Sequence, residues 1–198
     1  MLGRPKPKVR AISVLAAEFM TIESDYFLIG EDWQLYLTRF SRAAKSVGLP
    51  KREADLLGVA LNEMAENTAI HSQSPVPGLA GYHVAPGSAQ FCVADVGVGI
   101  LGSLRNCSVY QTVKTHREAI RLALHDGVSR FGPHQGGFGF GRVFKALVAN
   151  WGDVRFRSGE ACLTMSGVDL DADQGTEHFP PPLPGFQVSV TCRVRAPG

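Results

Sequence analysis

The stretch Gln90-Phe-Cys-Val-Ala-Asp-Val-Gly-Val-Gly-Ile100 indicates how this chain folds. Its first half, residues 90–94, is almost entirely apolar, which predicts a central, buried strand of a sheet. Asp95 follows at once, and Gly97 and Gly99 come after it. Glycines after a strand let the backbone approach a flat ligand, and a carboxylate accepts a hydrogen bond from an exocyclic amine. We therefore expect a binding edge at this strand end, with a plain glycine-rich turn as the alternative.

Two amphipathic helices are predicted ahead of this strand. Apolar residues recur every three or four positions over residues 32–47, which is the spacing of one helix face. Gly48 and Pro50 end that pattern. A second helix is expected from residue 51 to about residue 71.

The second helix carries a line of polar side chains. Glu63, Asn67 and His71 are four residues apart, so they lie along nearly the same face of a helix. A carboxylate and an amide oxygen one turn apart suit a hydrated Mg²⁺ ion, because magnesium prefers hard oxygen ligands and keeps several waters. An ordinary solvated helix face is the alternative interpretation.

A third motif lies late in the chain. Gly136-Gly-Phe-Gly-Phe-Gly141 precedes a helix predicted at about residues 142–150. Glycines at a helix start free backbone N–H groups to hold phosphate oxygens. A dinucleotide-binding fingerprint has a similar form, but it follows the first strand of a βαβ unit, whereas this motif follows a long loop. The spacing therefore indicates phosphate binding without a Rossmann domain.

The rest of the chain completes a two-layer α/β pattern. Strands are expected within residues 9–19 and near 80–84, 154–157, 161–165 and 187–194, and a helix is expected over 116–124. The remainder of 101–135 reads as irregular, and the polar, proline-rich stretch 169–184 reads as a loop. Residues 1–10 form a flexible tail, which leaves one domain over residues 11–198.

Composition excludes several classes of protein. A chain of 198 residues fits one domain, and a net charge of +2 gives no reason to expect nucleic acid as a partner. The four cysteines have no zinc-binding spacing, which favours reduced thiols. No apolar stretch is long enough to cross a bilayer, so we expect a cytoplasmic protein without a membrane partner.

Taken together and in this order, the three motifs resemble the N, G1 and G2 boxes of the GHKL ATPases. That family includes gyrase B, the heat-shock 90-kDa chaperones, histidine kinases and the MutL repair proteins. The resemblance extends over residues 32–194, which is most of the chain. It implies the Bergerat, or histidine-kinase-like ATPase, fold: a two-layer α/β sandwich with a mixed sheet and helices on one face.

The resemblance also implies a role for each motif residue, with ATP and Mg²⁺ as cofactors. Asn67 would coordinate Mg²⁺, Glu63 would act as general base, and Asp95 would bind the adenine amino group. Residues 103–135 would form a mobile lid over the nucleotide. The remaining cofactor-binding residues would be His71, Gly97, Gly99, Ile100, Gly137, Gly139 and Gly141.

Within this family, the chain looks most like the anti-sigma-factor serine kinases. Only about fifty residues precede the helix of Glu63, and they contain no histidine that could accept phosphate as in a histidine kinase. The segment 117–129 also resembles stand-alone members of the group. The resemblance implies a protein partner with a STAS domain or a sigma-factor regulator, and homodimerisation, which is frequent among such members.

Three functions remain open from the sequence. The first is a serine/threonine kinase that switches a protein partner. The second is a non-kinase ATPase, or an ATP-gated binding module, without phosphoryl transfer. The third is a structural module that binds no nucleotide, which the intact glycine motifs disfavour.

Overall fold

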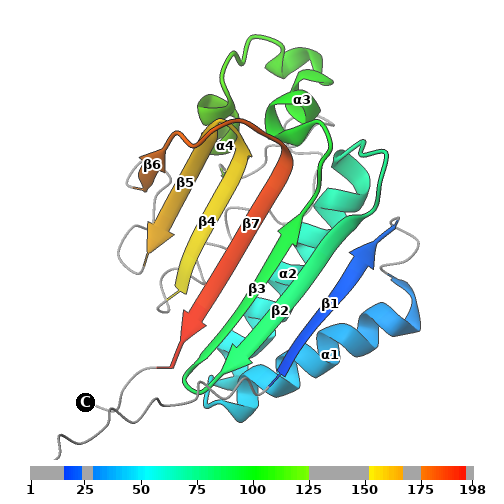
Figure 1. Cartoon of the computed structure of the whole chain (residues 1–198), viewed down its shortest axis with the longest axis vertical. Coiled ribbons are helices and arrows are strands. Elements are labelled where there is room, and N and C mark those ends of the chain that lie inside the picture. Colours follow the sequence, from blue (N-terminus) through cyan, green and yellow to red (C-terminus); the bar gives the residue numbers. More distant parts are fainter. Residues whose placement is uncertain (1–15, 24–28, 125–151, 167–174, 195–198) are drawn as a thin grey trace, which may run out of the picture.

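A computed structural model describes residues 16–23, 29–124, 152–166 and 175–194. These residues form a seven-stranded sheet in the order β1-β2-β3-β7-β4-β5-β6, with helices α1 and α2 packed on one face, as the sequence predicts (Figure 1). The strands are β1 (Ala16–Ile22), β2 (Gly78–Ala85), β3 (Ser88–Ala94), β4 (Gly152–Gly159), β5 (Ala161–Ser166), β6 (Thr176–His178) and β7 (Leu183–Arg193). The helices are α1 (Glu31–Ser46), α2 (Lys51–His71), α3 (Gly99–Arg105) and α4 (His116–Leu124), with a 3₁₀ turn at Ser108–Tyr110.

The two long helices agree with the prediction from apolar spacing. Glu31 and Asp32 lie in the first turn of α1 and Lys45 in its last turn, which matches the direction of the helix dipole. Gly48 has a φ of 94° directly after α1, a left-handed conformation that glycine adopts without strain. The chain reverses there, and α2 begins at Lys51.

An aromatic cluster joins the helix layer to the sheet. Trp33 stacks on Tyr36 with ring centroids 5.2 Å apart, and Tyr36 lies 5.1 Å from Tyr82 of β2. Phe40 stacks on Tyr82 at 4.9 Å and meets Phe91 of β3 edge-on at 6.2 Å. These offset and edge-to-face contacts are the favourable geometries for aromatic rings. Trp33 is therefore a core residue, as its place in the apolar pattern predicts.

Every strand pairing among the described residues is antiparallel, so the prediction of a mixed sheet is wrong. Two tight connections account for much of this: Pro86 and Gly87 join β2 to β3, and Glu160 joins β4 to β5. The chain forms two helices, α1 and α2, between β1 and β2. Strand β7 lies between β3 and β4 in the sheet, although it follows both of them in the sequence.

Strand β3 is central, as predicted, because it lies between β2 and β7, but only one of its faces is fully buried. Phe91 and Val93 are buried under the helices, whereas Gln90 is exposed and Cys92 is half-buried on the other face. An antiparallel sheet can leave one face to solvent, so an apolar run does not by itself imply a second covering layer.

Residues 101–124 are more regular than predicted. Helix α4 forms with the predicted bounds, but α3 and the 3₁₀ turn occupy part of a stretch expected to be irregular. A small apolar cluster explains their order, because Leu101 and Leu104 of α3 pack with Tyr110 and with Ala119 of α4. Likewise, β6 and the start of β7 lie within the expected loop 169–184.

Some predictions fall on residues outside the described ranges. These are the tail at residues 1–10, the helix at about 142–150 and the final part of the expected lid, residues 125–135.

Candidate functional site

The predicted polar line lies on one flank of α2. Glu63, Asn67 and His71 are each half-buried. Helix α1 contacts the other flank, where Trp33 Nε1 donates a hydrogen bond to Asn62 Oδ1 at 2.8 Å. Asn67 is five residues beyond Asn62, and successive residues are about 100° apart around a helix. Asn67 is therefore about 140° from Asn62, and its flank points away from α1.

Glu63 occupies a setting that favours its protonated form. Burial raises the pKa of its carboxyl, and the nearby negative charge of Glu66 raises it further. Glu66 is itself held in place, because Asn62 Nδ2 donates to its Oε1 at 2.6 Å. A carboxyl with a raised pKa holds a proton more readily, as a general base must after it accepts one.

Asp95 is a buried carboxylate at the end of β3, with 6% of its surface exposed. Its Oδ1 accepts hydrogen bonds from the backbone N–H of Gly97 at 2.8 Å and of Phe186 at 3.3 Å. Burial raises the pKa of Asp95, and these two hydrogen bonds partly offset that effect. Both bonds use Oδ1, so Oδ2 accepts no hydrogen bond from any residue that the structure describes.

The turn after Asp95 packs against the end of α2. The backbone N–H of Val98 donates to the carbonyl of Ser72 at 2.8 Å, one residue beyond His71. A Cβ atom on Gly97 would lie 1.9 Å from that carbonyl oxygen, so no side chain fits at this position. From the sequence, Gly97 is expected to let a ligand approach the backbone. In the structure, the group that approaches Gly97 closely is the carbonyl of Ser72, at the end of α2.

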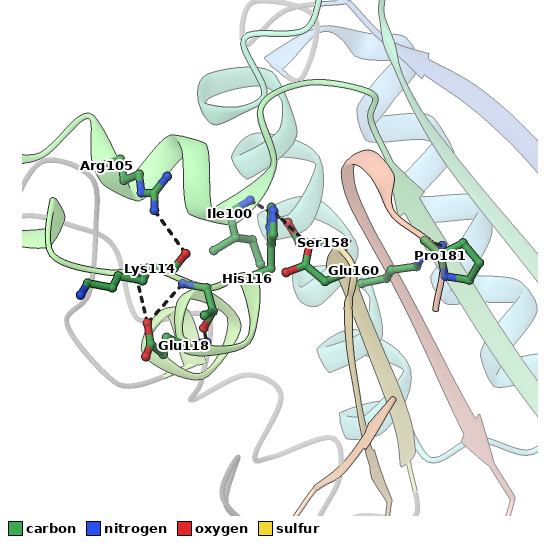
Figure 2. Close-up of polar contacts among 10 residues, drawn as sticks. Ile100, Arg105, Lys114, His116, Glu118, Ser158, Glu160 and Pro181 are labelled. Atoms are coloured by element: carbon green, nitrogen blue, oxygen red, sulfur yellow. Dashed lines mark hydrogen bonds and ion pairs between the residues drawn. The ribbon is translucent and has the colours of Figure 1, made fainter. Parts of the chain in front are cut away.

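Gly99 and Ile100 are held from the opposite side by β4 and β7. Gly99 has a φ of 66°, and a Cβ there would lie 2.6 Å from Ser158 Oγ and 2.9 Å from the carbonyl oxygen of Gly185. Ser158, which is 1% exposed, accepts a hydrogen bond from the N–H of Ile100 at 3.0 Å (Figure 2). The turn over residues 95–100 is thus fixed between α2 and the sheet.

Helix α4, which lies within the expected lid, packs against β4 and β5 and contacts β6. Glu177 of β6 accepts from Arg117 Nε at 2.9 Å and from Arg121 Nε at 2.7 Å. The ring of His116 covers Gly159, and its Nε2 lies 3.6 Å from Glu160 Oε2 (Figure 2). The first two-thirds of the predicted lid therefore include a helix with specific polar contacts to β6 and to the turn between β4 and β5.

The start of α4 carries a capping box that is not among the three sequence motifs. Thr115 Oγ1 accepts from the N–H of Glu118 at 3.1 Å, and Glu118 Oε2 accepts from the N–H of Thr115 at 3.2 Å. The same carboxylate accepts from the N–H of Lys114 at 2.9 Å (Figure 2). The Thr-x-x-Glu pattern is a recognisable sequence signal for a helix start. By contrast, Ser72, Ser158 and Phe186 carry no local signal that could have marked them.

The structure therefore brings together the first two motifs but leaves the third unplaced. The end of the α2 polar line meets the turn that carries Asp95. Gly137, Gly139 and Gly141 lie outside the described residues.

The described part of the chain holds neither a metal-binding cluster nor a membrane-spanning helix. It contains no group of three or more histidine, cysteine, aspartate or glutamate side chains placed to hold a metal ion. A Mg²⁺ ion held by one side chain and by phosphates needs no such group. Among the same residues, none of the helices has the length and apolar character needed to span a membrane.

Comparison of the chain with models of protein families, with curated proteins and with solved structures finds no match. The function must therefore be inferred from the residues and geometry of the chain itself.

Proposed function

We propose that this protein binds Mg-ATP beside α2 and the turn 95–100, and that it uses ATP to phosphorylate, and so switch, a protein partner. The proposed activity is that of a serine/threonine kinase of the anti-sigma-factor type. The observation that supports it most is the contact between Ser72 and Val98, because it joins the α2 polar line to the turn that carries Asp95.

The setting of Asp95 suits recognition of adenine. Its Oδ1 is committed to two backbone N–H groups, so the carboxylate has a fixed orientation. Its Oδ2 remains an acceptor for the exocyclic amine of the base. A buried carboxylate without that donor is unfavourable, as its raised pKa indicates, and a bound amino group would relieve this cost.

The polar line on α2 suits the phosphate end of the same nucleotide. Asn67 offers an amide oxygen to Mg²⁺, which would supply charge neutralisation of the phosphates when bound. His71 lies one turn further along, next to the Ser72 contact. Gly137, Gly139 and Gly141 are proposed to donate backbone N–H groups to phosphate oxygens.

Glu63 is proposed to orient and deprotonate the hydroxyl of a serine on the partner. Its raised pKa brings it closer to the working pH, which increases the efficiency of a general base. A STAS-domain protein or another sigma-factor regulator is the proposed partner class.

Thermal unfolding with and without Mg-ATP tests the nucleotide site. At a ligand concentration of 100 times Kd, binding to the folded state alone stabilises by about 2.7 kcal/mol. Asp95→Asn keeps the Oδ1 acceptor but replaces Oδ2 by an amide donor, which repels the adenine amine. We expect wild type to gain stability and Asp95→Asn to lose most of that gain. Asp153→Asn in β4, whose half-buried carboxylate pairs with Arg193, is the control and should gain as much stability from Mg-ATP as wild type does.

An equal response of wild type and Asp95→Asn would exclude the adenine assignment. No response from wild type at millimolar Mg-ATP would exclude the whole proposal.

Glu63→Gln separates binding from phosphoryl transfer. The variant keeps size and hydrogen bonding but cannot accept a proton, so we expect the same ATP-induced stabilisation with loss of transfer, by about 10²-fold or more. Transfer of labelled phosphate to a STAS-domain protein measures this. Glu31→Gln, which alters an exposed carboxylate of α1, is the control and should transfer phosphate as wild type does. If transfer persists in Glu63→Gln, the base is a different group.

A further inference from the structure

A shallow groove lies between α1 and α2, and Val59, one turn before Glu63, is at the edge nearest to the α2 polar line. We call this surface the α1–α2 groove. The residues that matter below are Leu37, Arg42 and Lys45 of α1, and Asp55, Gly58 and Val59 of α2.

The groove is long enough to bind a third helix along α1 and α2. The two helices run antiparallel, since Trp33 contacts Asn62 at one end and Ser41 contacts Asp55 nearer the other. The α1 side of the groove runs from residue 34 to residue 45, a length of about 16 Å at about 1.5 Å per residue. That length accommodates about three turns of a partner helix, packed as ridges into a groove.

Nothing in the described part of the chain requires a glycine at position 58. Gly58 lies within α2 and is not among the glycines with positive φ. A Cβ atom there would meet nothing within 4 Å. Glycine inside a helix is about 1 kcal/mol less favourable than alanine. Close approach of another molecule to the helix backbone would account for it.

An apolar surface borders this glycine. Val59 leaves 49% of its surface exposed, and Leu37 on the facing helix is only partly buried. A partner with an apolar stripe would cover both side chains and gain their burial.

The rim of the groove carries excess positive charge. Lys45 and Lys51 both contact the Asp55 carboxylate, at 3.0 and 2.7 Å, so this one anion is shared by two cations. Arg42 is exposed and has no ion pair with any described residue. Its guanidinium is therefore available to a carboxylate on a partner.

We propose that the α1–α2 groove binds an amphipathic helix of a protein partner, with its apolar stripe over Gly58 and Val59 and its acidic flank against Arg42. The groove is centred on Asp55, Gly58 and Asn62, whereas the polar line continues through Asn67 and His71 on the neighbouring flank of α2, so this inference goes beyond the nucleotide site and does not rest on it.

Two synthetic helices serve as probes with the full-length protein in the absence of nucleotide. Both are 16-residue amphipathic peptides with the same leucine stripe, and the other positions are glutamate in one and lysine in the other. We expect the glutamate peptide to shift the amide NMR signals of Gly58 and Val59, and to bind at least about tenfold more tightly than the lysine peptide.

Three variants of the protein locate the binding. Gly58→Leu places a side chain in open space, so it should fold normally and abolish binding. Arg42→Glu should weaken the glutamate peptide by about tenfold or more. Arg52→Glu reverses an exposed charge that does not line the groove, and it should bind as wild type does.

The proposal is overturned if both peptides bind equally or not at all, if the shifts lie elsewhere, or if Arg42→Glu binds as wild type does. Two other occupants would also overturn it. A dimer that Gly58→Leu dissociates would assign the groove to a second copy of the chain. A single-stranded oligonucleotide that displaces the glutamate peptide would assign it to nucleic acid.

Discussion

Asp95 illustrates how a single buried carboxylate links stability to binding. Its pKa is raised by burial, so the folded protein holds this proton to a higher pH than the unfolded chain does. Between the unfolded and folded pKa values the native state binds more protons, and the free energy of unfolding decreases as the pH rises through that window. Asp95 therefore lowers the free energy of unfolding at neutral pH. A binding role for its carboxylate would explain why the protein carries this cost.

Asp95→Asn removes this titration while keeping the Oδ1 acceptor. We expect the unfolding free energy of the variant, relative to wild type, to increase as the pH rises through the window and then to level off. Urea unfolding at a series of pH values measures it. A constant difference at all pH values would show that Asp95 has an unshifted pKa.

Gly97 and Gly58 form a matched pair, since one glycine is required by packing and the other is not. Gly97→Ala forces its Cβ against the Ser72 carbonyl and should destabilise the protein by about 1–3 kcal/mol. Gly58→Ala meets open space and should stabilise it by about 1 kcal/mol. Chemical unfolding of both variants gives the comparison. Equal effects would mean that the turn 95–100 does not pack on α2 as described.

At the scale of elements, α4 is held by two independent devices. The Thr115–Glu118 capping box satisfies the N–H groups of Glu118 and Thr115 at its start, and Glu177 connects it to β6. Burial raises the pKa of Glu177, but the hydrogen bonds from Arg121 and Arg117 outweigh this and lower it. The pairs are partly exposed, so each is worth only about 0.2–1 kcal/mol.

Thr115→Ala removes the capping hydroxyl. We expect a loss of about 1 kcal/mol, within the range of about 0.5–2 kcal/mol for such caps. Amide hydrogen exchange should accelerate mainly in residues 116–120. Thr112→Ala, which alters an exposed threonine outside the box, serves as control. If both variants exchange alike, the capping contacts add nothing to helix stability.

At the scale of the whole molecule, one apolar core unites segments that are far apart in sequence. Phe40 of α1, Leu57 of α2, Ile120 of α4 and Val188 of β7 belong to the same buried cluster. Such a core favours a single cooperative unfolding transition for the described part of the chain.

Phe40→Ala tests this cooperativity. Deleting the ring should destabilise the fold by about 3–5 kcal/mol. Because the core is shared, global amide exchange should accelerate equally in α1 and in the strands of β4 and β7. Faster exchange in α1 alone would indicate two separate folding units.

Much of the fold could be predicted because its signals are local. The apolar spacing of α1 and α2 predicts their bounds, and the Thr-x-x-Glu pattern before α4 is likewise a local signal for a helix start. Asp95 and Gly97 stood out by type and spacing, whereas Phe186 bonds to Asp95 across 91 positions and Ser158 bonds to Ile100 across 58. Such partners cannot be found from neighbouring residues.

The amino-acid sequence by itself determined the long helices, most of the strands and the order of the three motifs, because these depend on residues close together along the chain. Only the tertiary structure decided that the sheet is antiparallel and that one of its faces is open. It also decided that the Ser72 carbonyl at the end of α2 lies too close to Gly97 for any side chain there. It also decided that α1 and α2 leave an unfilled groove. These features arise from contacts between distant segments, whose free energies depend on how the segments pack.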